Sequence, residues 1–382
     1  MFNTQGGFDV ERVRSIGLPV MHKERGEKRA FLPSFVKRLY DLDVDVVLEH
    51  GYGEKLGFSA ADYRSANSRA RFGSREEVYG QDVIVVLRAP EFEDLSRMKK
   101  GAFLFSMLHY DTRPAFVEAL VKAGIRSFSL DSIADDAGNR LVVTYELTAG
   151  GGVREAFRQA EARWPDFYSA DRRPTRVTVH GIGHLGIQAG RASFAMGDPS
   201  IRSKAEQHGV KGVLVTYLER DVTRHPSEVN RVLSDTDILI DATKRADPTE
   251  FVIRNEQVGY LPEHAIILDL TADPYDTRTR PIQVKAIEGI PTGTLDQYVF
   301  EPDDPVYDAI PDGVDSRNRR VVVSCNAWPG VTPIECMKVY EEQLVPMVTL
   351  VCLKGGVEER SADPLERALY RSTLEHFLKA RN

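Results

Sequence analysis

The sequence contains few cysteines, and their spacing suits neither a disulfide framework nor a metal site. Only three occur among 382 residues, and no two of them form a CxxC pair. An odd count without such a pair is typical of a protein in a reducing compartment. No other cluster of histidines, cysteines and carboxylates has the spacing of metal ligands. We therefore expect a cytoplasmic protein without a bound metal.

An excess of positive charge and a long apolar run are also missing. Lysine and arginine number 50 and aspartate and glutamate 57, which gives a net charge of −7. This balance argues against the basic footprint of a nucleic-acid-binding protein. The best apolar run, residues 345–353, is shorter than the roughly 20 residues that a membrane helix needs. We expect no nucleic-acid partner and no membrane association.

The composition is instead that of an ordinary globular protein, with 42% hydrophobic and 28% charged residues. The length favours two or three domains. Short β-branched runs alternate with amphipathic helical patterns, which predicts an α/β fold of βαβ units with mostly parallel sheets. The expected strands are residues 44–48, 83–87, 103–108, 141–144, 177–180, 213–217, 238–241, 266–270 and 321–324. Long C-terminal helices are expected at residues 336–353 and 364–380.

A run of three glycines separates two α/β series. We interpret Gly150–Gly152 as a hinge and the helical pattern of residues 153–164 as a connector between domains. The second series starts at Arg176, and the C-terminal helices are expected to return to the first domain. The predicted domains are a substrate-binding domain of residues 1–148 with 333–382 and a dinucleotide-binding domain of residues 149–332.

A glycine fingerprint opens the second series. An apolar strand is followed by Gly181, Gly183 and Gly186 in the pattern GxGxxG, and then by a helical pattern. In such a turn the first glycine allows the tight bend, the second lets the backbone approach a pyrophosphate, and the third lets helix and strand pack closely. An ordinary βα turn is the alternative, but the strand and helix in this order favour a dinucleotide site. His184 and Leu185 lie within the fingerprint and are expected to contact the cofactor.

The end of the next strand leaves the choice between NAD and NADP open. The strand is expected to end at Tyr217, where NAD sites usually have an acidic residue that binds the ribose hydroxyls. Glu219 could serve NAD, whereas Arg220 could bind the 2′-phosphate of NADP. Tyr217, Glu219 and Arg220 are therefore all candidate cofactor contacts. Residues 198–209, which precede this strand, are expected to form an extra loop.

Five stretches carry a family resemblance. They are Glu27–Pro33, Val47–Gly53 with Gly57–Tyr63, Val86–Pro90 with Phe105–His109, the glycine fingerprint, and Leu268–Asp273 with Asn326–Pro333. In their order and spacing these stretches resemble the alanine dehydrogenase and pyridine nucleotide transhydrogenase superfamily, which also contains the saccharopine dehydrogenases. The similarity extends from about residue 16 to about residue 347.

The resemblance implies both a fold and a reaction. The fold would be two Rossmann-like domains with parallel sheets and an interdomain cleft. The reaction would be the reductive amination of a 2-oxo acid, or its reverse, with NAD or NADP as the cofactor. The partner would then be a small-molecule amino acid or 2-oxo acid, and the family suggests a homo-oligomer.

The resemblance also implies roles for five residues. Arg29 corresponds to an arginine that binds the substrate carboxylate, and Asn326 to an asparagine at the cleft. His109 and Asp273 correspond to a catalytic histidine and a catalytic aspartate. Arg88 stands where alanine dehydrogenases have a substrate-binding lysine. An arginine can still clamp a carboxylate there, but it cannot shuttle a proton.

The residues themselves support sites at His109 and Asp273. Each follows an apolar strand, and the carboxyl ends of parallel strands line ligand crevices. A histidine at such a place can act as a general acid and base near neutral pH. The structural alternatives are a histidine at a sheet edge and an aspartate in a turn, and Asp269 is the competing carboxylate.

The sequence thus predicts a cytoplasmic NAD(P)-dependent amino-acid dehydrogenase. It would catalyse reversible oxidative deamination of an L-amino acid by hydride transfer to nicotinamide, with L-alanine and pyruvate as the leading pair. One alternative is a saccharopine- or opine-type dehydrogenase, which joins a 2-oxo acid to a second amino acid. An alternative of another class is a nucleotide-binding subunit or regulator without turnover.

Overall fold

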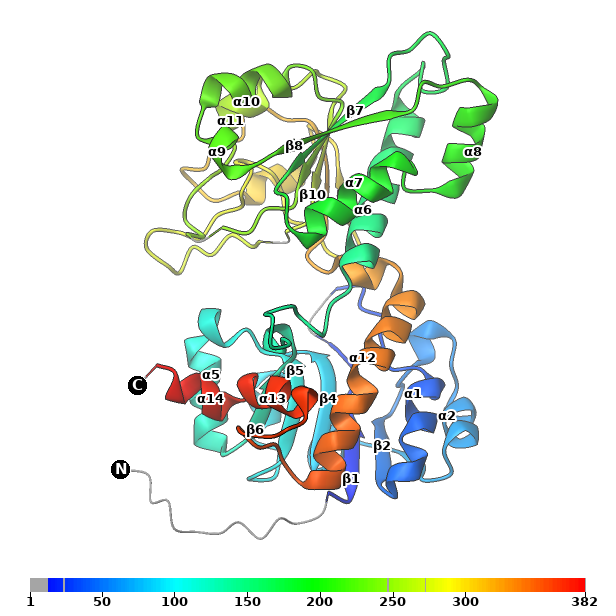
Figure 1. Ribbon diagram of the computed structural model, residues 1–382, viewed down its shortest axis with the longest axis vertical. Helices are drawn as coiled ribbons and strands as arrows, with labels where there is room; N and C mark the ends of the chain where they lie inside the picture. The colour runs from blue at the N-terminus through cyan, green and yellow to red at the C-terminus, as the bar shows by residue number, and fades with distance from the viewer. Residues whose placement is uncertain (1–12, 23–24, 246, 272, 382) are drawn as a thin grey trace. The chain divides into compact units, whose positions relative to one another are not determined.

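The computed structural model describes residues 13–22, 25–245, 247–271 and 273–381, and these form two compact units (Figure 1). The first unit contains the described residues before 23, residues 27–144 and residues 333–381. The second unit contains residues 25–26 and the described part of 145–332. Each unit has a six-stranded sheet that is mostly or entirely parallel, so the predicted α/β class is confirmed. The interdomain cleft stays a prediction.

The sheet of the first unit has the strand order of a Rossmann fold. Its order is β3-β2-β1-β4-β5-β6, with every neighbouring pair parallel. The order reverses between β1 and β4, and this reversal is where open α/β sheets bind ligands. The strands are β1 (Ser15–Leu18), β2 (Asp45–Glu49), β3 (Ala70–Gly73), β4 (Val83–Arg88), β5 (Phe103–Met107) and β6 (Arg126–Ser129).

Local signals explain where the helices of this unit begin and end. Capping boxes at Ser59 and Ser74 start α2 and α3, and Pro114 and Gly124 delimit α5. In Figure 1 the orange and red C-terminal helices lie with the blue and cyan strands of the same unit. The helices are α1 (Pro33–Arg38), α2 (Ala60–Ala66), α3 (Arg75–Tyr79), α4 (Phe92–Leu95), α5 (Pro114–Ala123), α12 (Pro333–Lys354), α13 (Pro364–Arg371) and α14 (Leu374–Lys379).

The sheet of the second unit has the order β11-β12-β10-β9-β7-β8, and all pairs are parallel except β11 with β12. Its order reverses between β7 and β9. The strands are β7 (Thr175–His180), β8 (Val213–Leu218), β9 (Ile238–Asp241), β10 (Ile266–Asp269), β11 (Val299–Phe300) and β12 (Val321–Ser324). The helices are α6 (Tyr145–Arg163), α7 (His184–Phe194), α8 (Pro199–Gln207), α9 (Arg220–Thr223), α10 (Pro226–Leu233) and α11 (Asn255–Val258).

Both faces of this second sheet are buried, as is usual for parallel sheets. On one face, side chains such as Val179 and Leu268 pack with α6, α7 and α8. On the other face, side chains such as Leu239 and Ile267 pack with α10 and α11. Successive side chains of a strand point to opposite faces of the sheet, so the register determines on which face each strand-end side chain lies.

Several predicted elements are wrong in type or extent. Residues 141–144 do not form a strand, and residues 199–207 form helix α8 rather than a loop. The expected helix over residues 364–380 is interrupted, because Thr373 caps a new helix by accepting a hydrogen bond from the His376 backbone N–H. Strands β1, β3, β6 and β11 were not predicted.

The interpretation of the glycine run as a hinge is also wrong, because these residues lie inside helix α6. A Cβ atom on Gly152 would lie 2.5 Å from Cδ2 of Leu270 and 3.0 Å from Cδ1 of Leu268. The absence of a side chain therefore lets α6 lie close to the residues of β10. Gly150, by contrast, has nothing within 4 Å of its Cβ position.

The different surroundings of Gly150 and Gly152 allow a test of whether the glycine run is helical. Gly150→Ala should raise the free energy of unfolding by about 0.5–1 kcal/mol, because alanine restricts the unfolded chain and fits the helix. Gly152→Ala should lower it, because the new methyl group meets Leu270. Calorimetric melting temperatures would check both changes. A lower melting temperature for Gly150→Ala would contradict a continuous helix at this position.

Candidate functional site

A pocket of about 660 Å³ lies at the carboxyl ends of β7, β8 and β9, where the strand order of the second unit reverses. Ligands of open α/β sheets bind at such a reversal. The pocket is lined by residues 180–183, 218–220, 223–224, 242–245, 247 and 250–252. Fingerprint residues thus form one wall of the pocket, and the segments after β8 and β9 form the others.

The three fingerprint glycines have the geometry that a dinucleotide requires. Gly181 has φ +102°, and a Cβ there would lie 2.7 Å from the Ala242 carbonyl oxygen. A Cβ on Gly186 would lie 2.0 Å from the Gly181 carbonyl oxygen, so the α7 helix can approach the turn only with glycine. Gly183 has nothing within 4 Å of its Cβ position and lines the pocket. Helix α7 begins there without a side-chain cap, so its first N–H groups suit an anion such as a pyrophosphate.

The other predicted cofactor contacts divide into two groups. Glu219 and Arg220 line the pocket. His184, Leu185 and Tyr217 do not: the His184 ring stacks on Tyr145, with centroids 5.7 Å apart, while Leu185 and Tyr217 pack against the core.

Tyr217 does not reach the pocket because β8 continues one residue further, to Leu218. A Cβ on Gly190 of α7 would lie 1.8 Å from Oη of Tyr217, so the phenol ring occupies the space beside that glycine. Glu219 is consequently the first residue beyond the strand, which is the usual place of an acidic ribose ligand.

Three further cations line this pocket and were not predicted, namely Arg224, Lys244 and Arg245. Arg245 connects the pocket to Asp273, since its Nη2 lies 2.6 Å from Oδ2 of Asp273. The same guanidinium donates to the carbonyl oxygens of Glu250 and Val284. The predicted catalytic carboxylate is therefore held by an arginine whose side chain is buried and which belongs to no sequence motif.

Four neighbouring strands of the second sheet carry a buried polar residue at the same register position. His180, Asp241, Asp269 and Ser324 occupy matching positions on β7, β9, β10 and β12, so their side chains lie on one face of the sheet. Nζ of Lys285 lies 2.6 Å from Oδ2 of Asp269, and Ser324 Oγ donates to the same oxygen. Lys285 and Asp269 are each about 1% exposed. Asp269 is thus a structural carboxylate that neutralises a buried lysine.

Asp241 lies opposite Asp269 on the neighbouring strand β9. Burial and the nearby charge of Asp269 raise the pKa of Asp241 to about 7, whereas Lys285 holds the pKa of Asp269 below its usual range against the effect of burial. Burial also lowers the pKa of His180 to about 4. Within the described chain, Oδ2 of Asp241 and Nδ1 of His180 have no hydrogen-bond partner.

The first unit holds His109 against a carboxylate. His109 follows β5 in a left-handed conformation with φ 50°, and its backbone N–H donates to Oδ1 of Asp131. Nδ1 of the ring lies 3.4 Å from Oδ2 of Asp131, whose Oδ1 also accepts from Ser129 Oγ. Partial burial lowers the pKa of His109, Asp131 opposes this shift, and Arg113, Arg140 and Arg88 reinforce it. The ring is therefore oriented and largely neutral near pH 7.

Arg29 is buried and engaged by a residue of its own segment. Its Nε and Nη2 atoms donate to the two carboxylate oxygens of Glu27 at 2.8 and 2.5 Å. The side chains of Arg29 and Glu27 are 5% and 1% exposed. The predicted contact of Arg29 with a substrate carboxylate would require that carboxylate to compete with Glu27.

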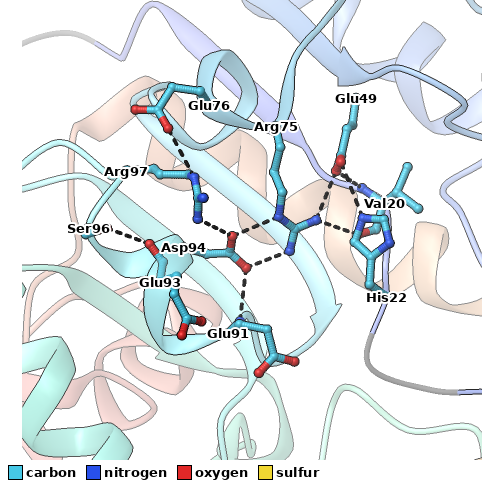
Figure 2. A network of polar contacts seen from close by, with 10 residues as sticks. All are labelled: Val20, His22, Glu49, Arg75, Glu76, Glu91, Glu93, Asp94, Ser96 and Arg97. Atoms are coloured by element: carbon cyan, nitrogen blue, oxygen red, sulfur yellow. Dashed lines mark hydrogen bonds and ion pairs between the residues drawn. The ribbon is translucent and has the colours of Figure 1, made fainter.

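Arg88 ends β4 at the reversal point of the first sheet, after a register irregularity between Val85 and Arg88. It borders a small cavity with Val20, His22 and Arg75. The network in Figure 2 braces this region: Arg75 binds both carboxylate oxygens of Asp94 at 2.8 and 2.6 Å. Glu49 accepts from Arg75 and from the Val20 backbone N–H (Figure 2). The segment after β1, the end of β2, α3 and α4 are thereby tied together.

Asn326 lies in the second unit, two residues after β12. Its backbone N–H donates to the Gly293 carbonyl oxygen. Its side-chain Oδ1 is buried and has no hydrogen-bond partner among the described residues. The amide thus offers an unused acceptor. Among all the residues that the structure describes, no group of histidines, cysteines or carboxylates could hold a metal ion.

The fingerprint can be tested by adding side chains to it. Gly183→Val should weaken dinucleotide binding at least tenfold while leaving the melting temperature unchanged, because its Cβ position is open to the pocket. Gly186→Ala should lower both, because its methyl group would meet a backbone carbonyl. Titration calorimetry and thermal melting would measure these effects. Unchanged affinity in Gly183→Val would show that the dinucleotide binds elsewhere.

The buried carboxyl of Asp241 predicts a pH-dependent stability. A group whose pKa is raised on folding stabilises the protein at low pH and loses that contribution as the pH rises toward the folded-state value. The stability gained in Asp241→Asn over wild type should therefore grow between about pH 4 and pH 7, by up to about 1.4 kcal/mol per pH unit, and then level off. Denaturant unfolding at several pH values would measure it.

Asp221→Asn, at an exposed position, is the matched control. A constant difference between Asp241→Asn and wild type across this range would mean that Asp241 is ionised throughout.

Comparisons with known proteins place the sequence among its relatives. Residues 20–146 match the family model described as Alanine dehydrogenase/PNT, N-terminal domain. NAD(P) transhydrogenase subunit alpha of Haemophilus influenzae is 23% identical over 67% of this chain and 56% of its own length. Alanine dehydrogenases of Halomonas elongata and Mycobacterium tuberculosis are 24% and 23% identical, over 61% and 76% of this chain and 62% and 79% of their own lengths. The chain thus spans less than two thirds of the first two of these relatives.

Solved structures show the same fold over nearly the whole chain. An L-alanine dehydrogenase matches with a TM-score of 0.69 at 19% identity, covering 94% of both chains. A transhydrogenase from Sinorhizobium meliloti matches with a TM-score of 0.61 at 18% identity, covering 89% of this chain and 95% of its own. The resemblance indicated by the sequence is confirmed: residues 20–146 match the alanine dehydrogenase/PNT N-terminal domain, and the chain resembles the alanine dehydrogenase and pyridine nucleotide transhydrogenase superfamily.

Proposed function

We propose that this protein is an NAD(P)-dependent oxidoreductase that interconverts an amino acid and a 2-oxo acid. The observation that carries the proposal is the His109–Asp131 pair, set among arginines, in a chain that also has a glycine-lined dinucleotide pocket. A carboxylate-binding site with an acid–base group suits an amino acid, and a dinucleotide pocket suits redox chemistry.

The second unit would bind the cofactor, which supplies a hydride acceptor or donor when bound. Gly181 and Gly183 would admit the pyrophosphate, and the first N–H groups of α7 would bind its charge. Glu219 at the end of β8 would bind the ribose of NAD, whereas Arg220 and Arg224 would suit the 2′-phosphate of NADP. Both cofactors stay open.

The overall reaction fixes what the side chains must do. Oxidation of the amino acid removes a hydride from its α-carbon, water replaces nitrogen at that carbon, and ammonium, the 2-oxo acid and one proton are released. His109 would take the proton from the substrate, because its largely neutral ring can accept it. Asp131 would stabilise the resulting imidazolium, as it already faces Nδ1.

The remaining candidates would bind rather than transfer protons. Arg88 would pair with the α-carboxylate through parallel hydrogen bonds. Arg29 would act indirectly, because its hydrogen bonds to Glu27 hold in place the segment that contains both residues. Asp273, oriented by Arg245, would orient ammonia or water and stabilise the cationic imine, and Asn326 would offer its unused acceptor.

A nucleotide-binding subunit without amino-acid turnover is the second candidate, favoured by the similarity to the Haemophilus influenzae transhydrogenase subunit. No helix in the described ranges is long and apolar enough to cross a bilayer. For the first candidate, we propose a cytoplasmic homo-oligomer with L-alanine and pyruvate as the reference substrate pair. A saccharopine- or opine-type reaction, with a second amino acid as amine donor, would use the same groups.

The assay that separates these candidates follows oxidation of NADH and NADPH with 2-oxo acids and ammonia or an amino acid. Wild type should consume the dinucleotide only when both an oxo acid and an amine are present. His109→Gln should lose about 100- to 10,000-fold in turnover, because a general acid–base group is gone, while its cofactor affinity stays unchanged.

His208→Gln, at an exposed position of the second unit, is the matched control and should behave as wild type. Near-normal turnover of His109→Gln would remove this histidine from the mechanism. Dinucleotide binding without any oxo-acid consumption would favour the subunit without turnover.

A further inference from the structure

Strand β8 is an open edge of the second sheet. It is the last strand on its side, and within the described chain it pairs with β7 alone (Figure 1). The sheet of the first unit has two further strands beyond β1, whereas the second sheet has one beyond β7. The second sheet is therefore one strand shorter on this side, and β8 presents backbone groups with which another strand can pair.

Alternate residues of β8 leave their backbone groups unpaired. The Leu218 carbonyl oxygen accepts from the Gly181 N–H directly after β7, so the even-numbered residues of β8 face β7. Successive residues of a strand bond to opposite sides, so the odd-numbered ones face outward. Among the described residues, the backbone groups of these outward residues have no hydrogen-bond partner. They are Val213, Val215 and Tyr217.

Large apolar side chains are exposed next to this edge. Leu214 of β8 is 54% exposed, although side chains of a parallel sheet are usually buried on both faces. On α7, Ile187 and Phe194 are 39% and 52% exposed. These two residues are seven positions apart, which is about two helical turns, so they lie on the same side of the helix.

This exposed side of α7 points past β8. A Cβ on Gly186 would lie 3.4 Å from Cγ1 of Val179 on β7, and one on Gly190 would lie 1.8 Å from Oη of Tyr217, so α7 lies over both strands. Around the helix, the buried Ala189 lies on one side of Gly186, where α6 packs. Gly190 and the two exposed side chains lie on the other side, away from α6.

We propose that a second copy of this chain pairs with β8 in an antiparallel manner across a two-fold axis, so that the two six-stranded sheets become one. In one register all three outward residues pair with one another, with Val215 opposite Val215 and Val213 opposite Tyr217. Each facing pair then exchanges two backbone hydrogen bonds. Leu214 lies opposite Thr216 of the second copy and shields both from water. This inference rests on the homo-oligomer of the proposed function and names its contact surface.

Helix packing and charge both favour a second copy as the partner. Because neighbouring strands are about 4.8 Å apart, the α7 helices of the two copies would lie about 10 Å apart, which is a usual distance for packed helices. Ile187 and Phe194 of both copies would then meet. Lys211 precedes β8 and Glu219 follows it, so antiparallel pairing brings opposite charges together at both ends. The surface is thus complementary to itself.

Cysteine cross-linking tests the register. Opposite residues that are not hydrogen-bonded to each other have Cα atoms about 4.5 Å apart, which a disulfide can span, whereas diagonal neighbours are about 7–8 Å apart. After exchange of subunits, an equimolar mixture of Leu214→Cys and Thr216→Cys should form a covalent dimer on mild oxidation, and each variant alone should not. The three native cysteines are buried. No cross-link in the mixture, or an equal one in a single variant, would overturn this pairing.

Sedimentation equilibrium tests the dimer itself. Wild type should sediment as a dimer or a multiple of it. Leu214→Asp should raise the dissociation constant at least tenfold, because it replaces apolar contacts at the two-fold axis by two nearby carboxylates. Val215→Pro should do the same, since it removes an outward N–H and keeps the bonds to β7. Leu353→Asp, at a 70% exposed position on α12, is the matched control and should stay within twofold of wild type.

A monomeric wild type would overturn the proposal, as would a Leu214→Asp variant that dissociates no more than Leu353→Asp. Thermal melting of both variants would show that they are folded. Sedimentation and cross-linking need neither substrate nor cofactor, so a failure of the proposed reaction would leave their outcome unchanged. A monomeric wild type with full turnover would contradict the dimer and leave the reaction standing.

Discussion

The ion pair between Lys285 and Asp269 is the contact on which the second unit depends most. Both side chains are almost completely buried, and each would be strongly unfavourable there without the other. Asp269 also accepts hydrogen bonds from Thr271 and Ser324, and its carbonyl oxygen accepts from Nε1 of Trp328. One residue, Asp269, therefore connects the end of β10 to β12 and to the segment of Lys285 through its carboxylate, and to the turn after β12 through its backbone carbonyl.

The Lys285–Asp269 pair is also connected to residues that are proposed to act in the reaction. The carbonyl of Val284, the neighbour of Lys285, accepts from Arg245, and Arg245 holds Asp273. Trp328 fixes the segment that contains Asn326. On the other side of the pair, burial and the negative charge of Asp269 raise the pKa of Asp241 to about 7. The polar groups at this sheet end are thus coupled, and the position of each depends on a lysine that no motif contains.

The two units use the same architectural principle with different charges. In each, the strand order reverses and polar residues collect at the carboxyl ends on both sides of the reversal. The second unit presents glycines and backbone N–H groups there, which suit a pyrophosphate. The first unit presents arginines and a histidine braced by hydrogen bonds, which suits carboxylates. The proposed division into cofactor and substrate units follows from this difference in chemistry.

Sequence patterns predicted the elements whose residues follow general rules. The apolar strands β4, β9 and β12 were found because every residue of a central parallel strand favours burial. Strand β6 was missed because it contains two buried serines, which Tyr110 and Asp131 satisfy from elsewhere.

The glycine run was misread because glycine disfavours helices in isolation, whereas contact with β10 requires it here. The two units of the structure separate at the start of α6.

The candidate site was predictable only where motifs encode it. The fingerprint and His109 lie directly after strands and could be found from the chain itself. Asp131 and Arg113 could not, because a surface charge and a site charge look alike until the fold brings them together. The pairing of Glu27 with Arg29 could have been predicted, since the two residues are two positions apart in a stretch that carries the resemblance.

The most direct test of the central claim follows the hydride itself. Wild-type protein is incubated with a 2-oxo acid, an amine and a reduced nicotinamide dinucleotide that carries deuterium on the transferable position of C4. The account predicts one deuterium on the α-carbon of the amine product, detected by mass spectrometry. Deuterium that passes only to a second dinucleotide, or that stays in the first, would contradict an oxidoreductase acting on the carbon–nitrogen bond of an amino acid.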